Sequence, residues 1–397
     1  MTAISSSQSR CSAIGARLLS ATLLLPSLAL IGCGTEPSEE QGDEQGETEE
    51  TGEGEPARTI PILGDGTHDI NELEVTILSS EADGLNFPTD CEFKPGTNDL
   101  WTTNRQDFSV VVYQDVGTDS QLAIKIRDPI ENGIHFLAKP AALAFGQEGT
   151  FATAQQEDGV TQPGDPPDGS FMGPTLWTSN LDDFTGGHWG HLDMLHNSPL
   201  SSGIAWESEN TYWVFDGRHG SLTRYKFNED HGLGGTDHTD GEIYRYVDGQ
   251  LGYENSIPSH VVLHFESSMV YAADTANSRI VRLDPSTATM GNNINPNYDG
   301  GIVRYMPGGT LDTIVDGTTL EPAMMKPSGL ELVDDILFVS DPITGIVYGF
   351  DLEGNLIDWL ETGLPPGSLM GMAFDDEGSM YIVDAANNQL RKFALRD

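Results

Sequence analysis

The chain has 397 residues, with 62 acidic side chains against 19 basic ones, so that its formal net charge is −43. Nucleic-acid binding requires a basic surface, and this balance therefore argues against a nucleic-acid partner. Cys11 falls within a predicted export signal and Cys33 at its predicted cleavage site. We therefore expect no disulfide, and Cys91 is predicted to be a small buried side chain of a strand.

Residues 1–32 have the pattern of an export signal. Arg10 and Arg17 form a basic start, and an apolar run follows from residue 18 to residue 31. This run is too short for a membrane-spanning helix, and it is typical of the apolar part of a signal peptide.

The signal ends in Leu30-Ile31-Gly32-Cys33, which resembles the bacterial lipobox. The resemblance implies cleavage before Cys33 and acylation of its sulfur and new amino group, which makes the membrane a partner through an N-terminal lipid. An ordinary signal peptide with a chance cysteine is the alternative. Gly34, rather than Asp, follows the cysteine, and in this class of protein that favours the outer membrane of the cell envelope.

Residues 33–58 are predicted to be an acidic, disordered tether. The segment is rich in Glu, Gly and Pro and contains no aromatic residue. It cannot bury enough apolar surface to offset the entropy lost on ordering, and its like charges keep it extended. Residues 59–397 are then the single folded domain. A specific partner for the acidic segment is the alternative to a plain spacer.

A repeat of short strands begins near residue 70 and indicates an all-β domain. Six segments share one plan: a small residue, an apolar strand, a turn, a second strand that ends in Asp or Asn, and a third strand. In five of them an apolar residue of the third strand comes six positions after the Asp or Asn. These pairs are Asn104 and Val110, Asp216 and Leu222, Asp274 and Ile280, Asp341 and Val347, and Asp384 and Leu390.

The remaining segment is degenerate. Gln155 takes the place of the Asp, and a Gly- and Pro-rich insertion at about 157–174 interrupts the repeat before a predicted third strand at 175–179. The repeat as a whole resembles the NHL repeat, and the copy at 273–280, Ala-Asp-Thr-Ala-Asn-Ser-Arg-Ile, carries the resemblance best. It implies an all-β, six-bladed NHL-type β-propeller, in which the recurrent Asp or Asn caps a turn. Residues 73–78 are expected to close the ring by adding a strand to the last blade.

Eight of the ten histidines lie between about 184 and 264, at positions where the repeat does not require a histidine. In the segment 187–199, a short helix would place His188 and His191 on one face and direct His196 elsewhere. Imidazoles bind zinc and other transition metals, so these residues are candidate metal ligands. A loop held by histidine hydrogen bonds is the alternative.

The segment 230–242 is a long insertion between two strands. It contains the metal candidates His231 and His238, and Asp237 and Asp240 faintly resemble the acidic positions of a calcium loop. The spacing fails the full EF-hand pattern, and a solvated Gly/Asp hairpin is the alternative.

His260 stands at the place where the innermost strand of its blade begins. It is therefore expected to face the central channel, although a histidine packed in the channel wall is the alternative. This stretch resembles a blade of peptidyl-α-hydroxyglycine α-amidating lyase, in which three blades each supply a histidine to a catalytic zinc. Here only His260 matches that pattern, so the activity is not carried over. The six residues at the equivalent place are Asp90, Ala142, Gly203, His260, Gly329 and Gly371.

Two functions remain open. The first is an anchored propeller that binds a ligand or protein through the channel mouth and the insertions of the second and third blades, with Arg218 and Tyr225 as polar groups. The second is a zinc-dependent lyase or hydrolase with its metal near the axis, held by His260 and some of the other histidines. The sequence contains no Gly-x-Ser-x-Gly elbow, phosphate loop or His-Glu-x-x-His motif.

Overall fold

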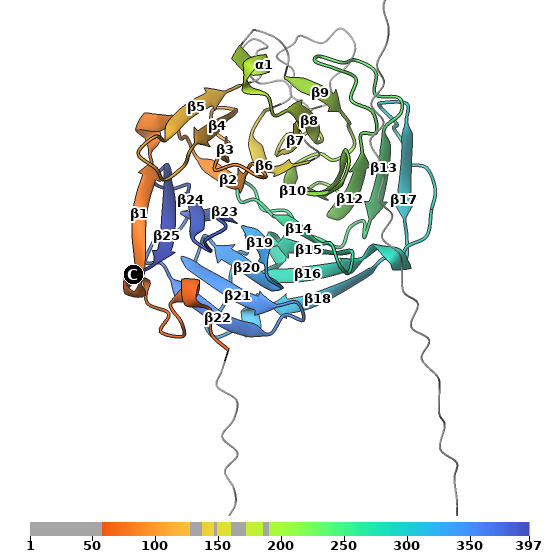
Figure 1. Ribbon diagram of the computed structural model, residues 1–397. Helices are drawn as coiled ribbons and strands as arrows, with labels where there is room; N and C mark the ends of the chain where they lie inside the picture. Colours follow the sequence, from red (N-terminus) through yellow and green to blue (C-terminus); the bar gives the residue numbers. More distant parts are fainter. Residues whose placement is uncertain (1–57, 128–136, 147–148, 160–171, 186–189, 397) are drawn as a thin grey trace, which may run out of the picture. The chain divides into compact units, whose positions relative to one another are not determined.

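The computed structural model describes residues 58–127, 137–146, 149–159, 172–185 and 190–396. Within these ranges the chain forms six sheets that follow one another around a ring (Figure 1). The signal, the tether and Cys33 lie outside the described residues. The expectation of a six-bladed, all-β propeller is confirmed.

Each blade consists of four antiparallel strands. Blade 1 contains β2 (Pro88–Phe93), β3 (Leu100–Asn104), β4 (Ser109–Gln114) and β5 (Leu122–Ile126), and blade 2 contains β6 (Pro140–Phe145), β7 (Thr150–Gln155), β8 (Thr175–Thr178) and β9 (His191–Met194). Blade 3 contains β10 (Ser201–Ser208), β11 (Thr211–Asp216), β12 (Ser221–Lys226) and β13 (Glu242–Tyr246), and blade 4 contains β14 (Val261–His264), β15 (Met269–Asp274), β16 (Arg279–Asp284) and β18 (Thr310–Asp316). Blade 5 contains β19 (Leu330–Val333), β20 (Ile336–Asp341), β21 (Ile346–Asp351) and β22 (Leu356–Glu361), and blade 6 contains β23 (Leu369–Phe374), β24 (Met380–Asp384), β25 (Gln389–Leu395) and β1 (Leu73–Ser79).

Blade 6 is completed by the first strand of the domain. β1 pairs antiparallel with β25, with Leu73 opposite Leu395 and Val75 opposite Phe393. This pairing joins the two ends of the domain and leaves no open blade edge at the join, as the closing strand at 73–78 was expected to do.

The recurrent Asp or Asn is structural. In each of the five regular blades, the residue just before the Asp or Asn pairs with the apolar residue that follows the Asp or Asn by six positions. In blade 4, for example, Ala273 pairs with Ile280, six positions after Asp274. The side chains of the Asp or Asn residues are fully buried. The aspartates accept hydrogen bonds from the following turns, as Asp216 does from the His219 N–H at 3.0 Å and Asp341 from the Ile343 N–H at 2.8 Å. Asn104 differs, because its Oδ1 accepts from the Asn86 N–H. The predicted capping role is confirmed for the aspartates.

Blade 2 replaces the predicted helix with a strand. Residues His191–Met194 form β9, and Met194 pairs with Thr175 of β8. A fourth strand satisfies the outer backbone groups of β8, and that tertiary demand outweighs the local helical spacing of the histidines. The expectation of a helix through His191 is therefore wrong, and His188 lies outside the described residues.

Blade 3 gains a fifth strand from the neighbouring blade. β17 (Ile302–Met306) belongs to the long connection between β16 and β18 of blade 4, yet it pairs parallel with β13. Blades 3 and 4 are thus tied together at the outside of the ring, where β17 lies beside β13 in Figure 1.

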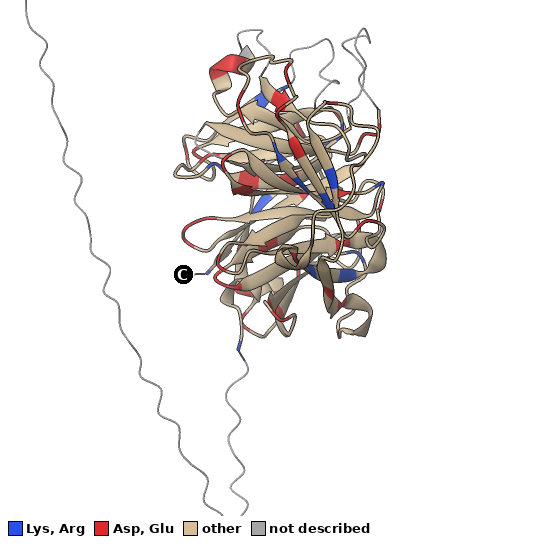
Figure 2. Cartoon of the chain, turned by 90° about the vertical axis from the view of Figure 1, so that its right-hand side faces the viewer, with Lys and Arg blue, Asp and Glu red and all other residues tan. Residues whose placement is uncertain are grey.

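Helical structure is limited to short segments. Among the described residues, the α-helix α1 spans Leu181–Thr185, and the other helical turns are of the 3₁₀ type: Pro61–Leu63, Ile70–Glu72, Glu81–Asp83, Thr275–Asn277, Pro285–Thr287 and Gly317–Thr319. Within the described ranges, no helix has the length and apolar character needed to cross a membrane. Acidic residues occur in many of the turns between strands (Figure 2).

The apolar core lies between neighbouring blades. Trp101 of blade 1 packs edge-on against Phe145 and Phe151 of blade 2, with ring centroids 5.3 and 4.9 Å apart. Such buried aromatic pairs supply large apolar contact areas, which hold each blade against the next. Cys91 is buried in β2, as expected.

Candidate functional site

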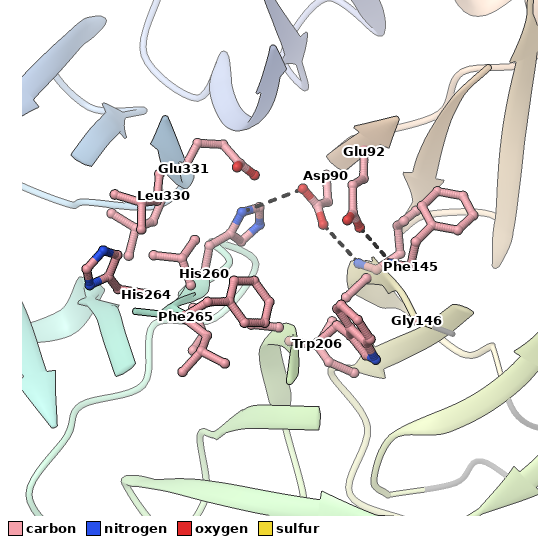
Figure 3. A pocket seen from close by; sticks show the side chains of 18 of the residues that line it. Asp90, Glu92, Phe145, Gly146, Trp206, His260, His264, Phe265, Leu330 and Glu331 are labelled. Carbon is pink, nitrogen blue, oxygen red and sulfur yellow. Dashed lines mark hydrogen bonds and ion pairs between the residues drawn. The ribbon is translucent and has the colours of Figure 1, made fainter. Parts of the chain in front are cut away.

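The first strands of the six blades surround the propeller axis, and His260 faces this axis as predicted. Its Nδ1 lies 3.6 Å from Oδ1 of Asp90, which occupies the equivalent place in blade 1 (Figure 3). Blades 1 and 4 are opposite one another in a ring of six, so the two side chains meet across the channel. Both are almost completely buried.

Glycine at the equivalent place of blade 6 leaves the room for this contact. A Cβ on Gly371 would lie 2.4 Å from Oδ1 of Asp90 and 2.8 Å from Cε1 of His260. Any larger residue would therefore displace one of the two side chains. The three glycines at the equivalent places also exclude a three-histidine zinc site of the lyase type, since they offer no ligand atoms.

Backbone hydrogen bonds join neighbouring blades at the end of the channel where the first strands begin. The Ser259 N–H donates to the Ser202 carbonyl at 3.0 Å, and the His260 N–H donates to the Ser328 carbonyl at 3.1 Å. These bonds join blade 4 to blades 3 and 5 at the axis. Asp90 and His260 line the cavity at this end, which we call its floor.

A cavity of about 720 Å³ extends from this floor to the opposite face of the ring. Its mouth is formed by turns between first and second strands, including Phe265, Asp334 and Asp335. Carboxylates dominate the polar part of the lining, and no Lys or Arg is among the described residues that form it. The acidic lining residues are Asp90, Glu92, Glu266, Glu331, Asp334 and Asp335.

Three of these carboxylates, Asp90, Glu92 and Glu331, are largely buried and are directed toward the same space (Figure 3). Burial raises the pKa of Glu92 well above its usual value, and the charges of Glu331 and Asp90 add to the effect. Burial and the charge of Asp90 raise the pKa of Glu331 in the same way. The Leu143 N–H donates to Asp90 and the Phe145 N–H to Glu92, at 2.9 and 3.0 Å, which partly offsets the cost of burying these groups.

The histidine on the floor is electrically neutral at physiological pH. Burial lowers the pKa of His260 to about 4, despite the nearby Asp90. A neutral imidazole neutralises none of the carboxylate charge, so the cavity remains an electronegative well.

Three aromatic side chains lie among the aliphatic residues of the apolar lining. The rings of Trp206 and Phe265 are 5.8 Å apart, and Phe265 is 60% exposed at the mouth. Phe145 contributes a third ring to the wall. Proteins recognise organic cations with aromatic ring faces and with carboxylates, and this cavity contains both kinds of group.

The other predicted groups lie away from the axis. His196 does not fold back toward it: its Nδ1 lies 2.6 Å from Oδ1 of Asp299, and its N–H donates to the same carboxylate. His191 is buried in β9 with its ring edge-on to Trp177. Neither histidine lines the cavity that His260 faces.

Arg218 and Tyr225 are not at the mouth of this cavity, and that expectation is corrected. Tyr225 is fully buried because its apolar ring packs in the core, where its hydroxyl donates to the His196 carbonyl and lies within hydrogen-bond distance of the Ser198 hydroxyl. Arg218 follows β11 and pairs with Asp158. The strand pairing places its turn at the end of the channel where the first strands begin, beside the start of β10.

A second polar cluster lies at the outside of the ring, between blades 2 and 3. Ligand atoms of Asp193, His231 and Asp240 lie within 4.8 Å of one another, and among the described residues they form the one such group of three. His238 Nδ1 is 2.5 Å from Asp193 Oδ1. Asp237 instead accepts hydrogen bonds from Thr239 within its own turn.

This cluster is distinct from the axial cavity. Asp193 belongs to β9, whereas the histidines and Asp240 belong to the connection between β12 and β13. Burial raises the pKa of Asp193 to about 6, against the opposing effect of His238. His231 and His238 are thus brought together, but far from the predicted axial site of His260.

The acidic wall of the cavity was not anticipated from the sequence, although a signal for it exists. Side chains at positions i and i+2 of a strand share one face. Two positions after the aligned place, blades 1 and 5 carry Glu92 and Glu331, where the other blades carry Ala144, Ala205, Val262 and Ala373. Two acids at a position otherwise held by small apolar residues would have indicated a charged channel.

The fold is shared with proteins of several kinds. No family model matches the chain, and no curated protein matches it. An auxiliary nutrient binding protein from Bacteroides ovatus is similar in structure, with a TM-score of 0.51 and 17% identity over 82% of this chain and 77% of that one. A second auxiliary nutrient binding protein, from Bacteroides thetaiotaomicron, has a TM-score of 0.52 and 11% identity over 81% and 76%. Luciferin-regenerating enzyme has a TM-score of 0.51 and 10% identity over 81% and 95%. At these identities the similarity establishes the fold alone.

Proposed function

We propose that this propeller binds an organic cation with an apolar body in its axial cavity. The observation that carries the proposal is the lining: six carboxylates, three aromatic rings and no Lys or Arg among the described residues. Carboxylates attract the positive charge, and the rings of Trp206 and Phe265 contact the apolar part and the face of the cation.

The energetics of the cavity favour a binding role over a structural one. Burial raises the pKa of Asp90, Glu92 and Glu331, and the charge of Asp90 adds to the effect on the two glutamates, so that these groups in their ionised forms destabilise the folded protein. Perturbed ionisable groups collected in one cavity are typical of functional sites. A bound cation offsets both the repulsion and the loss of water.

A capture role agrees with what the two Bacteroides propellers are called, auxiliary nutrient binding proteins. The similarity to those two proteins concerns the fold only. The proposal that this protein binds a cation rests on the residues that line its own cavity. The insertion at 228–256, between β12 and the first strand of blade 4, would extend the surface available to a larger ligand or a protein partner.

The enzyme alternative has less support at the axis. A zinc-dependent lyase or hydrolase would need further ligands beside His260, and the equivalent places of blades 3, 5 and 6 hold glycine. The residues present there do not fit a zinc ion of the lyase type.

The same proposal includes attachment to the cell envelope. The lipobox-like segment ending at Cys33 would carry the lipid, and residues 34–58 would hold the propeller away from the outer membrane. A cation-binding domain on such a tether would collect its ligand at the membrane surface.

Calorimetric titration of the purified protein with choline tests the binding proposal. The matched control ligand is 3,3-dimethyl-1-butanol, which has the same shape without the charge. We expect choline to bind and the neutral alcohol to bind at least tenfold more weakly, the equivalent of about 1.4 kcal/mol.

The matched variants are Glu92→Gln with Glu331→Gln in the cavity, and Glu74→Gln on the exposed face of β1. The cavity double variant should lose the preference for choline, whereas the surface variant should keep it. Equal affinity for the two ligands, or an unchanged preference in the double variant, would contradict the proposal.

A further inference from the structure

We infer that Asp193, His231 and Asp240 form a site for a divalent transition-metal ion of the zinc class, which fastens the long connection of blade 3 to the outer strand of blade 2. This site is independent of the axial cavity and of any ligand bound there. It consists of one residue from β9 and two from the segment between β12 and β13.

The connection already rests on β9 through its backbone. The Gly234 N–H donates to the His191 carbonyl at 2.9 Å. Gly235 is close enough to the same strand that a Cβ there would lie 3.1 Å from the Leu192 carbonyl oxygen. The residues of the cluster are therefore held next to one another by backbone packing, before any ion is considered.

The side chains are arranged around one point. Nε2 of His231 lies 2.9 Å from Oδ1 of Asp240, whose Oδ2 accepts from the Glu229 N–H at 3.1 Å. One ligand atom each of Asp193, His231 and Asp240 lies within 4.8 Å of the other two. Tetrahedral ligands at about 2.0–2.2 Å from a shared zinc ion are about 3.3–3.6 Å apart, so small movements of these side chains would bring their ligand atoms to that separation.

Asp193 supplies a separate indication that this cluster binds a cation. Its side chain is fully buried, and its Oδ2 has no hydrogen-bond partner among the described residues. A buried carboxylate oxygen without a donor is costly, and a bound cation removes that cost.

His238 orients Asp193 rather than joining the ligand set. Its Nδ1 approaches Oδ1 of Asp193 at 2.5 Å, which fixes the plane of the carboxylate. Contacts of this kind between a ligand and a second residue are usual around bound metals. His238 is therefore a positioning residue.

The ligand types select the metal. An imidazole with two carboxylates suits zinc and its neighbours among the transition metals, with water completing the coordination. Calcium needs six to eight oxygen ligands, and Asp237, the further acid of this loop, is engaged with Thr239. The limited exposure of His231, 18%, and of Asp240, 34%, leaves an entry path from solvent.

Metal content measured by mass spectrometry tests the site directly. The protein is loaded with Zn²⁺ and freed of excess, and we expect one equivalent per chain. His231→Ala and Asp240→Asn should lose the ion, while Asp237→Asn, in the same loop and with the same change of charge as Asp240→Asn, should retain it. Asp240 is partly exposed, so its variant should fold even if changes at the buried Asp193 do not.

Two further readouts separate a metal site from simple His–Asp ion pairs. Co²⁺ in the site should give d–d absorption bands that vanish in His231→Ala and change in His238→Ala. Zn²⁺ should raise the melting temperature of the unmodified protein by several degrees and leave that of His231→Ala unchanged. No bound Zn²⁺, or equal amounts in His231→Ala and Asp237→Asn, would overturn the inference, and so would retention of Ca²⁺ alone.

Discussion

Asp90 and His260 meet across the propeller axis, with 3.6 Å between the carboxylate Oδ1 and the imidazole Nδ1. At the equivalent place the other blades carry only Ala142, Gly203, Gly329 or Gly371. The contact is therefore possible because three of these blades carry glycine, and the fourth only alanine, at this level. It forms the floor of a cavity whose walls are acidic and aromatic.

Removing a carboxylate from the cavity should stabilise the protein. The pKa values of Glu92 and Glu331 are raised in the folded state above their ordinary value of 4.5. Their stabilising contribution is complete below that pH and is lost as pH rises through the folded pKa. Glu92→Gln should therefore raise the unfolding free energy at pH 8 by about 1 kcal/mol.

The measurement is urea unfolding of Glu92→Gln and Glu74→Gln across pH 4 to 8. The gain should shrink toward pH 4 for the cavity variant and be small throughout for the surface variant. A destabilised Glu92→Gln at pH 8 would contradict the account of the cavity as a strained acidic site.

The neutral His260 makes the opposite contribution to the dependence of stability on pH. Its folded pKa of about 4 lies below the ordinary value of 6.5. The unfolded chain therefore takes up a proton first as pH falls, and stability is lost between pH 6.5 and about 4. Asp90, whose carboxylate faces His260, is present both in the unmodified protein and in the His260→Gln variant, so the comparison between them isolates the effect of His260.

His260→Gln removes this loss. The difference in unfolding free energy between the unmodified protein and His260→Gln should move in favour of the variant by at least about 1 kcal/mol from pH 7.5 to pH 4.5. A constant difference over this range would show that His260 has the same pKa in the folded and the unfolded protein, which would contradict this account.

Cation binding should strengthen as pH rises. The carboxylates of the cavity hold protons to unusually high pH because they are buried and repel one another, and a cation binds to their ionised forms. The affinity for choline, measured by calorimetry at pH 5.5 and pH 8, should be higher at pH 8, with protons released to the buffer. Affinity that falls with rising pH would exclude the carboxylates as the recognition group.

Phe265 should contribute to binding and not to stability. Its ring is 60% exposed and contacts Trp206 at the cavity mouth, so little apolar surface is buried on folding. Phe265→Ala should weaken choline binding by about three- to tenfold, the range of a cation–π contact, with the melting temperature unchanged. Phe265→Leu keeps the apolar volume and should weaken binding to a similar extent, whereas full retention by both variants would place the ligand elsewhere.

The proposed anchor has a simple test in cell fractions. Cys33→Ala removes the only acylation site of the lipobox-like segment, so the protein should move from the membrane fraction to the soluble fraction. Gly34→Asp should keep it on the membrane but shift it from the outer to the inner membrane. Membrane association that survives Cys33→Ala would contradict lipid attachment at this residue.

The architecture was predictable because it repeats. Five copies of an Asp or Asn followed by an apolar residue six positions later reflect one turn and one strand pairing in each blade, as with Asp274 and Ile280. The turn and the strand pairing depend on residues that are close together in the sequence, so the sequence pattern is enough to predict them. The closing strand was predictable for a related reason, since the last blade lacked one strand.

The sites depended on contacts between distant segments. The helical spacing of His188 and His191 suggested a shared face, but β8 required a partner strand, and that pairing turned His191 into the core. His231 and Asp240 were visible as candidates, yet their third partner, Asp193, comes from another blade. No spacing along the chain encodes that meeting.

The sequence by itself determined the repeat, the closure of the ring and the axial position of His260, because each follows from strand periodicity and register. Only the tertiary structure decided what His260 faces. Asp90 lies opposite it because blades 1 and 4 are opposite in a ring of six, and Gly371 leaves the space in which they meet. The charge, the burial and the free space at the axis depend on residues from several blades. They are therefore set only when the closed ring brings these blades together.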